Sequence, residues 1–198
     1  NYVYGAWCVK PEDLKDAIGG MRALGISGIN VTAPHKVEVM KYIDVITDGA
    51  KKLGSVNTVV NRDGKLYGYN TDADGFCMAL TKAGIEIENS RILIIGAGGV
   101  VRPTLIRLID NKPKSITVVN RTKSKAKTLA EDILKSTGFE VNTEIDKLEF
   151  DIVINTTSAG MEPQENVMPI ENIEEINDLS FINENTAAVD MIYAVQKF

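Results

Sequence analysis

The sequence is poor in the residues that build metal and redox sites. Its 198 residues include one histidine and two cysteines, Cys8 and Cys77, which lie far apart along the chain. Zinc is usually held by about four closely spaced Cys or His ligands, so we expect no metal. Two free thiols are typical of a reducing compartment, and we expect the protein to be cytoplasmic.

Long apolar runs and an excess of basic residues are also lacking. No stretch reaches the roughly 18–20 apolar residues of a membrane helix, and 22 basic residues face 27 acidic ones, for a net charge of −5. We therefore expect no membrane and no nucleic acid as partner. The chain is 44% hydrophobic and 25% charged, which is typical of one large or two small globular domains.

The second half of the chain alternates strands with helices. Strands are predicted at 92–95, 115–119, 151–155 and 187–190, and helices at 100–109 and 123–135. This alternation implies βαβ units and a parallel sheet, so we expect a Rossmann-like domain over 85–193. Residues 162–185 are polar and poorly periodic, and are expected to form a long surface connection.

The first half has a different pattern and is expected to form a separate domain over residues 1–84. Its predicted elements are strands at 2–9 and 26–31, helices at 11–24, 37–43 and 72–83, and a hairpin joining 56–61 to 65–69 through Arg62-Asp63-Gly64. The fold class is therefore α/β, with two domains joined near residues 83–90.

A glycine-rich loop follows the most apolar predicted strand and opens a helix. The loop consists of Gly96, Ala97, Gly98, Gly99 and Val100. In this context the first glycine permits a tight turn, the second admits a pyrophosphate, and the helix N-terminus offers free N–H groups. The loop predicts a dinucleotide site, although the third fingerprint position is Val101. The alternative is a glycine turn that binds nothing.

The end of the next strand indicates which nucleotide binds. An NAD site usually has an acidic residue there, whereas this chain has Asn120, Arg121 and Thr122, followed by Lys125. A guanidinium and a hydroxyl suit a 2′-phosphate, so we expect NADP as the cofactor. A solvated basic helix start is the alternative.

Three polar clusters stand at strand ends or turns of the first half, at 30–36, 54–58 and 68–72. They contain Lys36 and Asp72, a pair that can hold and relay a proton beside a hydride-transfer site. The amides and hydroxyls around this pair suit a small polyol. Each cluster taken singly also suits a turn or a helix cap.

The chain resembles the shikimate dehydrogenase family across nearly its whole length. The matching segments are NVTAPHK at 30–36, GSVNT at 54–58, GYNTDADG at 68–75, GAGG at 96–99, NRTKSKA at 120–126, INTTSAGM at 154–161 and DMIY at 190–193. The resemblance implies NADPH-dependent, reversible reduction of 3-dehydroshikimate to shikimate, in the biosynthesis of chorismate and aromatic amino acids.

The resemblance also implies roles for individual residues. Lys36 and Asp72 would be the catalytic pair, and the single histidine, His35, is interpreted as structural. Substrate contacts would come from Thr32, Asn57 and Tyr193. Cofactor contacts would come from the 96–100 loop, from the 120–125 segment named above, and from Asp48, Thr156 and Met191.

Departures from the family pattern leave alternatives open. A Ser-rich motif that precedes the matched region in the family has no counterpart here, and residues 194–198 look like a remnant of the family's C-terminal helix. We therefore expect the chain to lack an N-terminal strand and part of its C-terminal region. The rival functions are a quinate/shikimate dehydrogenase and a non-catalytic NADP-binding paralogue. A homodimer and a fused enzyme are both compatible with the sequence.

Overall fold

The computed structural model describes residues 3–159, 167–169, 173, 176 and 180–191, and the chain divides into two compact units, 1–75 and 76–198. The division falls inside the first turn of α3 (Asp72–Lys82), whereas the predicted boundary lies after that helix. The buried side chains Cys77 and Leu80 of α3 belong to the second unit. The roles of the two units as substrate and cofactor domains stay predictions.

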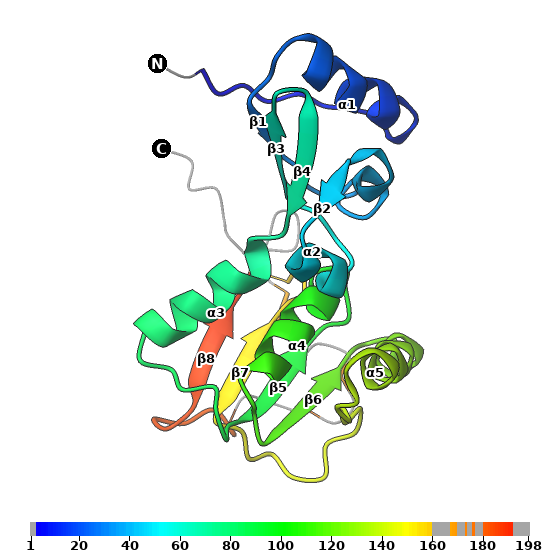
Figure 1. Cartoon of the computed structure of the whole chain (residues 1–198). Helices are drawn as coiled ribbons and strands as arrows, with labels where there is room; N and C mark the ends of the chain where they lie inside the picture. The colour runs from blue at the N-terminus through cyan, green and yellow to red at the C-terminus, as the bar shows by residue number, and fades with distance from the viewer. Residues whose placement is uncertain (1–2, 160–166, 170–172, 174–175, 177–179, 192–198) are drawn as a thin grey trace. The chain divides into compact units, whose positions relative to one another are not determined.

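The first unit is built on a four-stranded sheet with the order β1-β3-β4-β2 (Figure 1). Its strands are β1 (Gly28–Asn30), β2 (Val45–Ile46), β3 (Thr58–Arg62) and β4 (Lys65–Tyr69). Strand β3 runs antiparallel to both β1 and β4, and β2 runs parallel to β4.

The predicted hairpin is confirmed. Strands β3 and β4 are joined by Asp63 and Gly64, whose φ angles are 52° and 83°. Two positive φ angles in a two-residue loop match the right-handed twist of the flanking strands. The glycine at the second position adopts this conformation without the strain a Cβ would bring.

The first unit also contains helical segments. They are η1 (Pro11–Asp13), α1 (Leu14–Ala23), η2 (Glu38–Tyr42) and α2 (Asp48–Leu53). Leu14, Ile18 and Met21 recur at helical spacing on α1 and are buried in one cluster with Val59 of β3 and Leu66 of β4. The amphipathic pattern of α1 therefore closes the core of the first unit.

The Asp44 carboxylate connects three segments of the first unit. Asp44 Oδ2 accepts hydrogen bonds from the Leu66 backbone N–H at 2.7 Å and from Arg22 Nη2 at 2.9 Å. Donation by the Leu66 N–H, followed by that of the Arg22 guanidinium, lowers the pKa of Asp44 below its usual range. The ionised carboxylate thus links α1 to β4.

Three predictions for the first half need correction. The strand predicted at 2–9 does not form over the described residues 3–9. Among the described residues, β1 pairs only with β3, so no further strand adds to its other edge. The predicted helix at 37–43 is the 3₁₀-helix η2. The short elements β2 and α2 were not predicted, since two- and six-residue segments carry too little periodicity.

The second unit carries the predicted parallel sheet, with the strand order β6-β5-β7-β8 (Figure 1). Its elements are β5 (Arg91–Ile95), α4 (Val101–Asp110), β6 (Ser115–Val119), α5 (Lys123–Thr137), β7 (Ile152–Asn155) and β8 (Ala187–Asp190). The α/β fold class is therefore confirmed.

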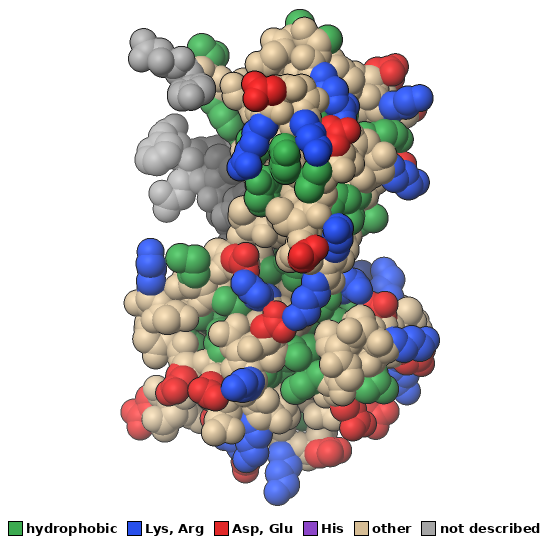
Figure 2. Space-filling model, in the orientation of Figure 1, with side chains coloured by type: hydrophobic (Ala, Val, Ile, Leu, Met, Phe, Trp, Pro, Cys, Tyr) green, Lys and Arg blue, Asp and Glu red, His purple; other side chains and the backbone are tan. Residues whose placement is uncertain are grey.

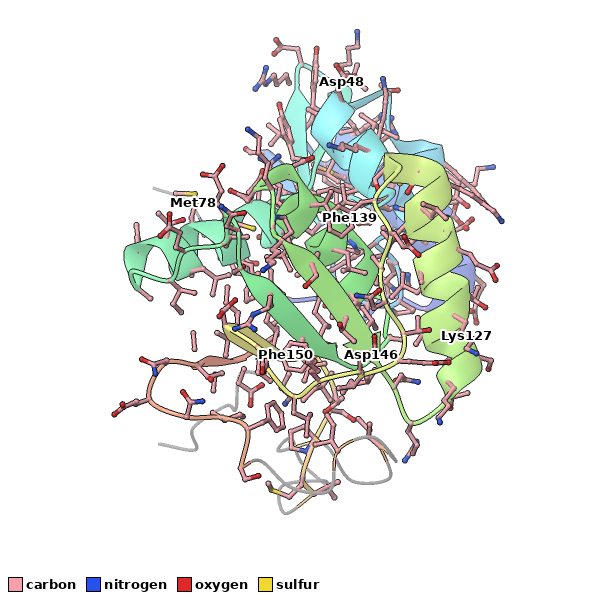
Figure 3. All side chains as sticks on the ribbon, turned by 90° about the horizontal axis from the view of Figure 1, so that it is seen from below. Asp48, Met78, Lys127, Phe139, Asp146 and Phe150 are labelled. Atoms are coloured by element: carbon pink, nitrogen blue, oxygen red, sulfur yellow. The ribbon has the colours of Figure 1, made fainter. Side chains whose placement is uncertain are left out.

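Both faces of the central strands are buried. Leu93 and Ile95 of β5 pack on one face against Phe150 (labelled in Figure 3) and Phe181. The two phenylalanine rings meet edge to face, with centroids 6.2 Å apart. Because side chains alternate along a strand, the fully buried Ile94 points to the opposite face, which α4 covers (Figure 1). Continuous apolar runs such as 92–95 are typical of strands covered on both faces.

The predicted surface connection over 162–185 is wrong in part. Ile173, Ile176 and Phe181 are 6%, 4% and 9% exposed and belong to the core cluster of the second unit. Their apolar side chains are spaced too irregularly to indicate a helix or strand, but each removes enough apolar area from water to stabilise a buried position.

Candidate active site

The first unit places Lys36 beside Asp72. Lys36 Nζ lies 2.7 Å from Asp72 Oδ2, and the two side chains are 33% and 44% exposed. Lys36 lies in the turn over 33–37 that follows β1, and Asp72 is the first residue of α3. Two residues 36 positions apart in the sequence thus form a solvent-accessible ion pair that can donate or accept a proton at one point.

Asn57 holds the other carboxylate oxygen. Its Nδ2 donates to Asp72 Oδ1 at 2.6 Å, and its Oδ1 accepts from the backbone N–H of Thr71 at 3.0 Å. Thr58 Oγ1 also donates to Asn57 Oδ1, at 3.0 Å. The two oxygens of Asp72 therefore have separate partners, which leaves the carboxylate one orientation.

Other predicted residues of the first unit stand in different settings. Thr32 is exposed two residues after β1. Nε2 of His35 lies 2.9 Å from Val9 O, which agrees with a structural histidine. Asp48 begins α2, is fully exposed and lies 3.5 Å from Lys51 Nζ (Figure 3). Tyr193 lies outside the described residues.

Gly96, the first residue of the glycine loop in the second unit, has room only for a bare backbone. Gly96 has a φ of +115°, and a Cβ added there would collide with Thr156 Oγ1. A Cβ at Gly98 or Gly99 would meet no described atom within 4 Å, so the loop is open on its outer side. This geometry fits a pyrophosphate that approaches the backbone at the start of α4.

Asn120 connects the glycine loop to the β6–α5 turn. Its Oδ1 accepts from the Ala97 N–H at 3.2 Å, and its Nδ2 donates to Thr122 O at 3.0 Å. Val101, the departure from the glycine fingerprint, is fully buried, whereas Val100 remains 37% exposed. The valine at position 101 thus packs into the core without closing the loop.

Arg121 and Lys125 supply free positive charge at this turn. Both are exposed, and neither side chain bonds to any of the described residues. Lys125 also lines a pocket of about 370 Å³, together with Ala97 and other residues of α5 as far as Asp132. The cationic and hydroxyl donors at this turn suit a 2′-phosphate, so the residues present fit NADP.

Thr156 and Met191 lie at the carboxyl ends of neighbouring parallel strands. Thr156 follows β7 and donates through Oγ1 to Ile95 O at 2.8 Å, while the Met191 N–H donates to Asn155 O at 3.0 Å. Ligands of open α/β sheets bind at this edge. The structure therefore brings Thr156 to the same sheet edge as Gly96.

Sequence reasoning missed the residues that support these side chains. Thr71, Asn70 and Ser55 lie inside the polar clusters but were not singled out, and Asn155 joins the ends of β7 and β8 by donating to Asp190 Oδ1 at 3.1 Å. Their signal was the density of amides and hydroxyls at strand ends. The partner of each amide could not be read from the sequence.

Other surfaces offer less chemistry. A cavity of about 490 Å³ lies at the C-terminal ends of α3 and α4, away from the predicted nucleotide residues. Charges of both signs are interspersed on the face drawn in Figure 2. Within the described ranges, no group of three or more His, Cys, Asp or Glu side chains could hold a metal ion, and no helix is long and apolar enough to span a membrane.

Comparisons with known proteins agree with this geometry. Residues 1–59 match the shikimate dehydrogenase substrate binding domain, and residues 78–191 match the shikimate / quinate 5-dehydrogenase family. Shikimate dehydrogenase (NADP(+)) of Geobacillus sp. (strain WCH70) is 46% identical over 195 residues, which cover 96% of this chain and 68% of the relative.

Solved structures give the same result. A crystal structure of shikimate dehydrogenase in complex with NADP+ has a TM-score of 0.83 at 40% identity, covering 98% of this chain and 67% of that one. Shikimate 5-dehydrogenase of Listeria monocytogenes, in complex with shikimate and NAD, has a TM-score of 0.83 at 31% identity, covering 97% and 68%.

The parallel sheet, the glycine loop and the basic turn define a dinucleotide-binding oxidoreductase. The chain belongs to the shikimate dehydrogenase family. The assignment of individual residues to catalysis and binding remains a set of predictions.

Proposed function

We propose that this protein catalyses the NADPH-dependent, reversible reduction of 3-dehydroshikimate to shikimate. The observation that carries this proposal is the 2.7 Å contact between Lys36 Nζ and Asp72 Oδ2 in a chain of this family. A ketone that accepts a hydride at carbon must also gain a proton at oxygen. The exposed ion pair provides that proton at a fixed place.

Lys36 is the proposed acid in the direction of reduction. The ammonium donates a hydrogen bond to the ketone oxygen and then its proton as negative charge develops there, so that the C=O bond becomes CH–OH. In the oxidation direction the neutral amine takes the hydroxyl proton back. Asp72 keeps Lys36 in place through the 2.7 Å contact.

The other polar residues of the first unit bind and orient the substrate. Thr32 and Asn57 offer a hydroxyl and an amide for the ring hydroxyls or the carboxylate, and Tyr193, outside the described residues, is proposed as a third contact. Asn57 already bonds to Asp72 at 2.6 Å. It therefore orients the substrate relative to the acid.

The second unit is proposed to bind NADP. When bound, the nicotinamide supplies or accepts the hydride. The backbone of the 96–100 loop holds the pyrophosphate, and Asn120 supports the loop through Ala97. Arg121, Thr122 and Lys125 hold the 2′-phosphate. Thr156 and Met191 are proposed to contact the nicotinamide, and Asp48 is proposed to lie near the nicotinamide as well.

One assay tests the reaction directly. Purified protein is mixed with shikimate and with either NADP or NAD, and the absorbance of the reduced nicotinamide is followed. We expect rapid reduction of NADP and much slower reduction of NAD. Failure to reduce either nucleotide, while NADP still binds by calorimetry, would support the non-catalytic paralogue instead.

Quinate is the second candidate substrate, because the matched family includes shikimate and quinate dehydrogenases. Quinate carries more hydroxyl groups than shikimate, and the sequence does not show which of the two rings the site prefers. The same assay with quinate in place of shikimate distinguishes the two. We expect the larger kcat/KM with shikimate.

The setting of the enzyme is also proposed. We place it in the cytoplasm and expect small molecules as its partners, with a homodimer as the assembly to test by sedimentation. The unit over residues 1–75 would bind the substrate and the unit over 76–198 would bind the nucleotide. Separate calorimetric titrations of shikimate and NADP into variants of each unit test this division.

A further inference from the structure

The side chain of Asn70 spans two segments of the first unit. It is 7% exposed and lies between the end of β4 and the start of α3. Its Nδ2 donates to Ser55 Oγ at 2.8 Å and to Ser55 O at 3.2 Å. Its Oδ1 accepts from the backbone N–H of Asp72 at 3.2 Å. Both ends of this buried amide are therefore engaged.

Asn57 makes the reciprocal connection. From the 54–58 segment it reaches Thr71 N and Asp72 Oδ1, while Asn70 reaches back to Ser55. The Asn57 backbone N–H also donates to Tyr69 O at 2.9 Å. Side-chain hydrogen bonds therefore run in both directions between the 54–58 segment and residues 69–72.

The two asparagines hold different parts of Asp72. Asn57 contacts the carboxylate, whereas Asn70 contacts the backbone N–H of the same residue. With the Asp72 backbone held by Asn70, the Asp72 carboxylate can approach Lys36 Nζ, which lies 2.7 Å away, from only one direction. A displacement of about 1 Å at a catalytic group can lower a rate by about a hundredfold.

We propose that Asn70 is a positioning residue for the reaction, acting only through Asp72. It fixes the Asp72 backbone so that the carboxylate and Lys36 stay aligned, and it touches neither substrate nor nucleotide. This inference rests on the proposed function. A purely structural role, as a buried cap at the start of α3, is the competing explanation.

A double-mutant cycle separates the two explanations. The kcat and KM for shikimate are measured in wild type, Asn70→Ala, Asp72→Asn and the double variant. Where a variant is too slow for a steady-state assay, its single-turnover rate constant is compared with that of wild type. We expect Asn70→Ala to lower kcat by about ten- to hundredfold with the Kd of NADP unchanged. In the Asp72→Asn background the same change should lower kcat by less than about twofold.

Asn61→Ala is the matched control. Asn61 is also an asparagine of the first unit whose Oδ1 accepts a backbone N–H, from Gly64 at 2.8 Å, but it lies in the hairpin. Its substitution should lower thermal stability while leaving kcat within about twofold of wild type. Equal losses of kcat in Asn61→Ala and Asn70→Ala would overturn the positioning role.

The remaining outcomes are distinct. Losses that multiply in the double variant would mean that Asn70 acts independently of Asp72, and would overturn this inference while leaving the proposed function intact. Absence of turnover in wild type with shikimate would overturn both. Loss of the Asn70→Ala effect in the Asp72→Asn background supports the inference.

Discussion

Asn57 Nδ2 lies 2.6 Å from Asp72 Oδ1, while Lys36 Nζ lies 2.7 Å from Asp72 Oδ2. The carboxylate therefore has one neutral and one cationic partner. Because the amide holds Asp72 independently, removing the amine should leave the carboxylate in place. The chemistry of Lys36 can thus be tested apart from the geometry of Asp72.

Lys36→Ala should lower kcat by about 10²–10⁴-fold, the range typical of general acid–base catalysis. The Kd for NADP, measured by calorimetry, should change little because Lys36 is not among the residues proposed to bind the nucleotide, most of which lie in the second unit. Lys41→Ala is the control, since Lys41 is an exposed lysine of the same region paired with Glu38. An unchanged kcat in Lys36→Ala would remove Lys36 from the mechanism.

Arg121→Ala should weaken NADP binding much more than NAD binding. A hydrogen bond to a charged group contributes about 1.5–3 kcal/mol, so we expect the Kd for NADP to rise about ten- to hundredfold. Titrations of both nucleotides measure this ratio. Lys127→Ala is a control on α5, the helix that follows this turn, because Lys127 lies on its outer side, 3.7 Å from Glu144 (Figure 3). Equal losses for both nucleotides would contradict a contact with the 2′-phosphate.

Much of the second unit could be predicted because its signals are local. The run 92–95 is apolar on both faces, and glycine follows it, so strand, loop and helix are recognisable within a dozen residues. The strand at Ser115–Val119 was predicted with the bounds that the structure has. Periodicity carries this information wherever an element is long and regular.

The contacts of the site could not be predicted from spacing. Asn57 and Asp72 are separated by a whole hairpin, and only the pairing of β3 with β4 brings Thr58 opposite Tyr69. The donors and acceptors of Asn70 likewise depend on that register. Polar clusters identify where such contacts occur, but which amide serves which partner is a property of the assembled sheet.

Gly96→Ala should impair both folding and nucleotide binding. A φ of +115° is strained for any residue with a Cβ, and the new methyl group would collide with Thr156 Oγ1. We expect a loss of about 1–3 kcal/mol in the free energy of unfolding, together with a higher Kd for NADP. Urea unfolding and calorimetry measure the two effects.

Gly19→Ala provides the control for that substitution. Gly19 lies inside α1, has no positive φ, and a Cβ there would meet no described atom within 4 Å. The change should stabilise the protein by about 0.5–1 kcal/mol and leave the Kd for NADP unaltered. A similar loss in both variants would show that glycine at position 96 has no special role.

Asp44→Asn should destabilise the first unit at neutral pH but not in acid. The Leu66 N–H and Arg22 lower the pKa of Asp44 in the folded protein below the ordinary value of 3.8. A depressed folded pKa stabilises the fold above the unfolded pKa, and this stabilisation is lost as the pH falls through the folded value. Urea unfolding at pH 7 should therefore show a lower midpoint for the variant. As the pH falls below about 4 the two midpoints should converge, because asparagine resembles the protonated acid. A difference that persists unchanged in acid would mean that the ionised carboxylate contributes nothing to the link between α1 and β4.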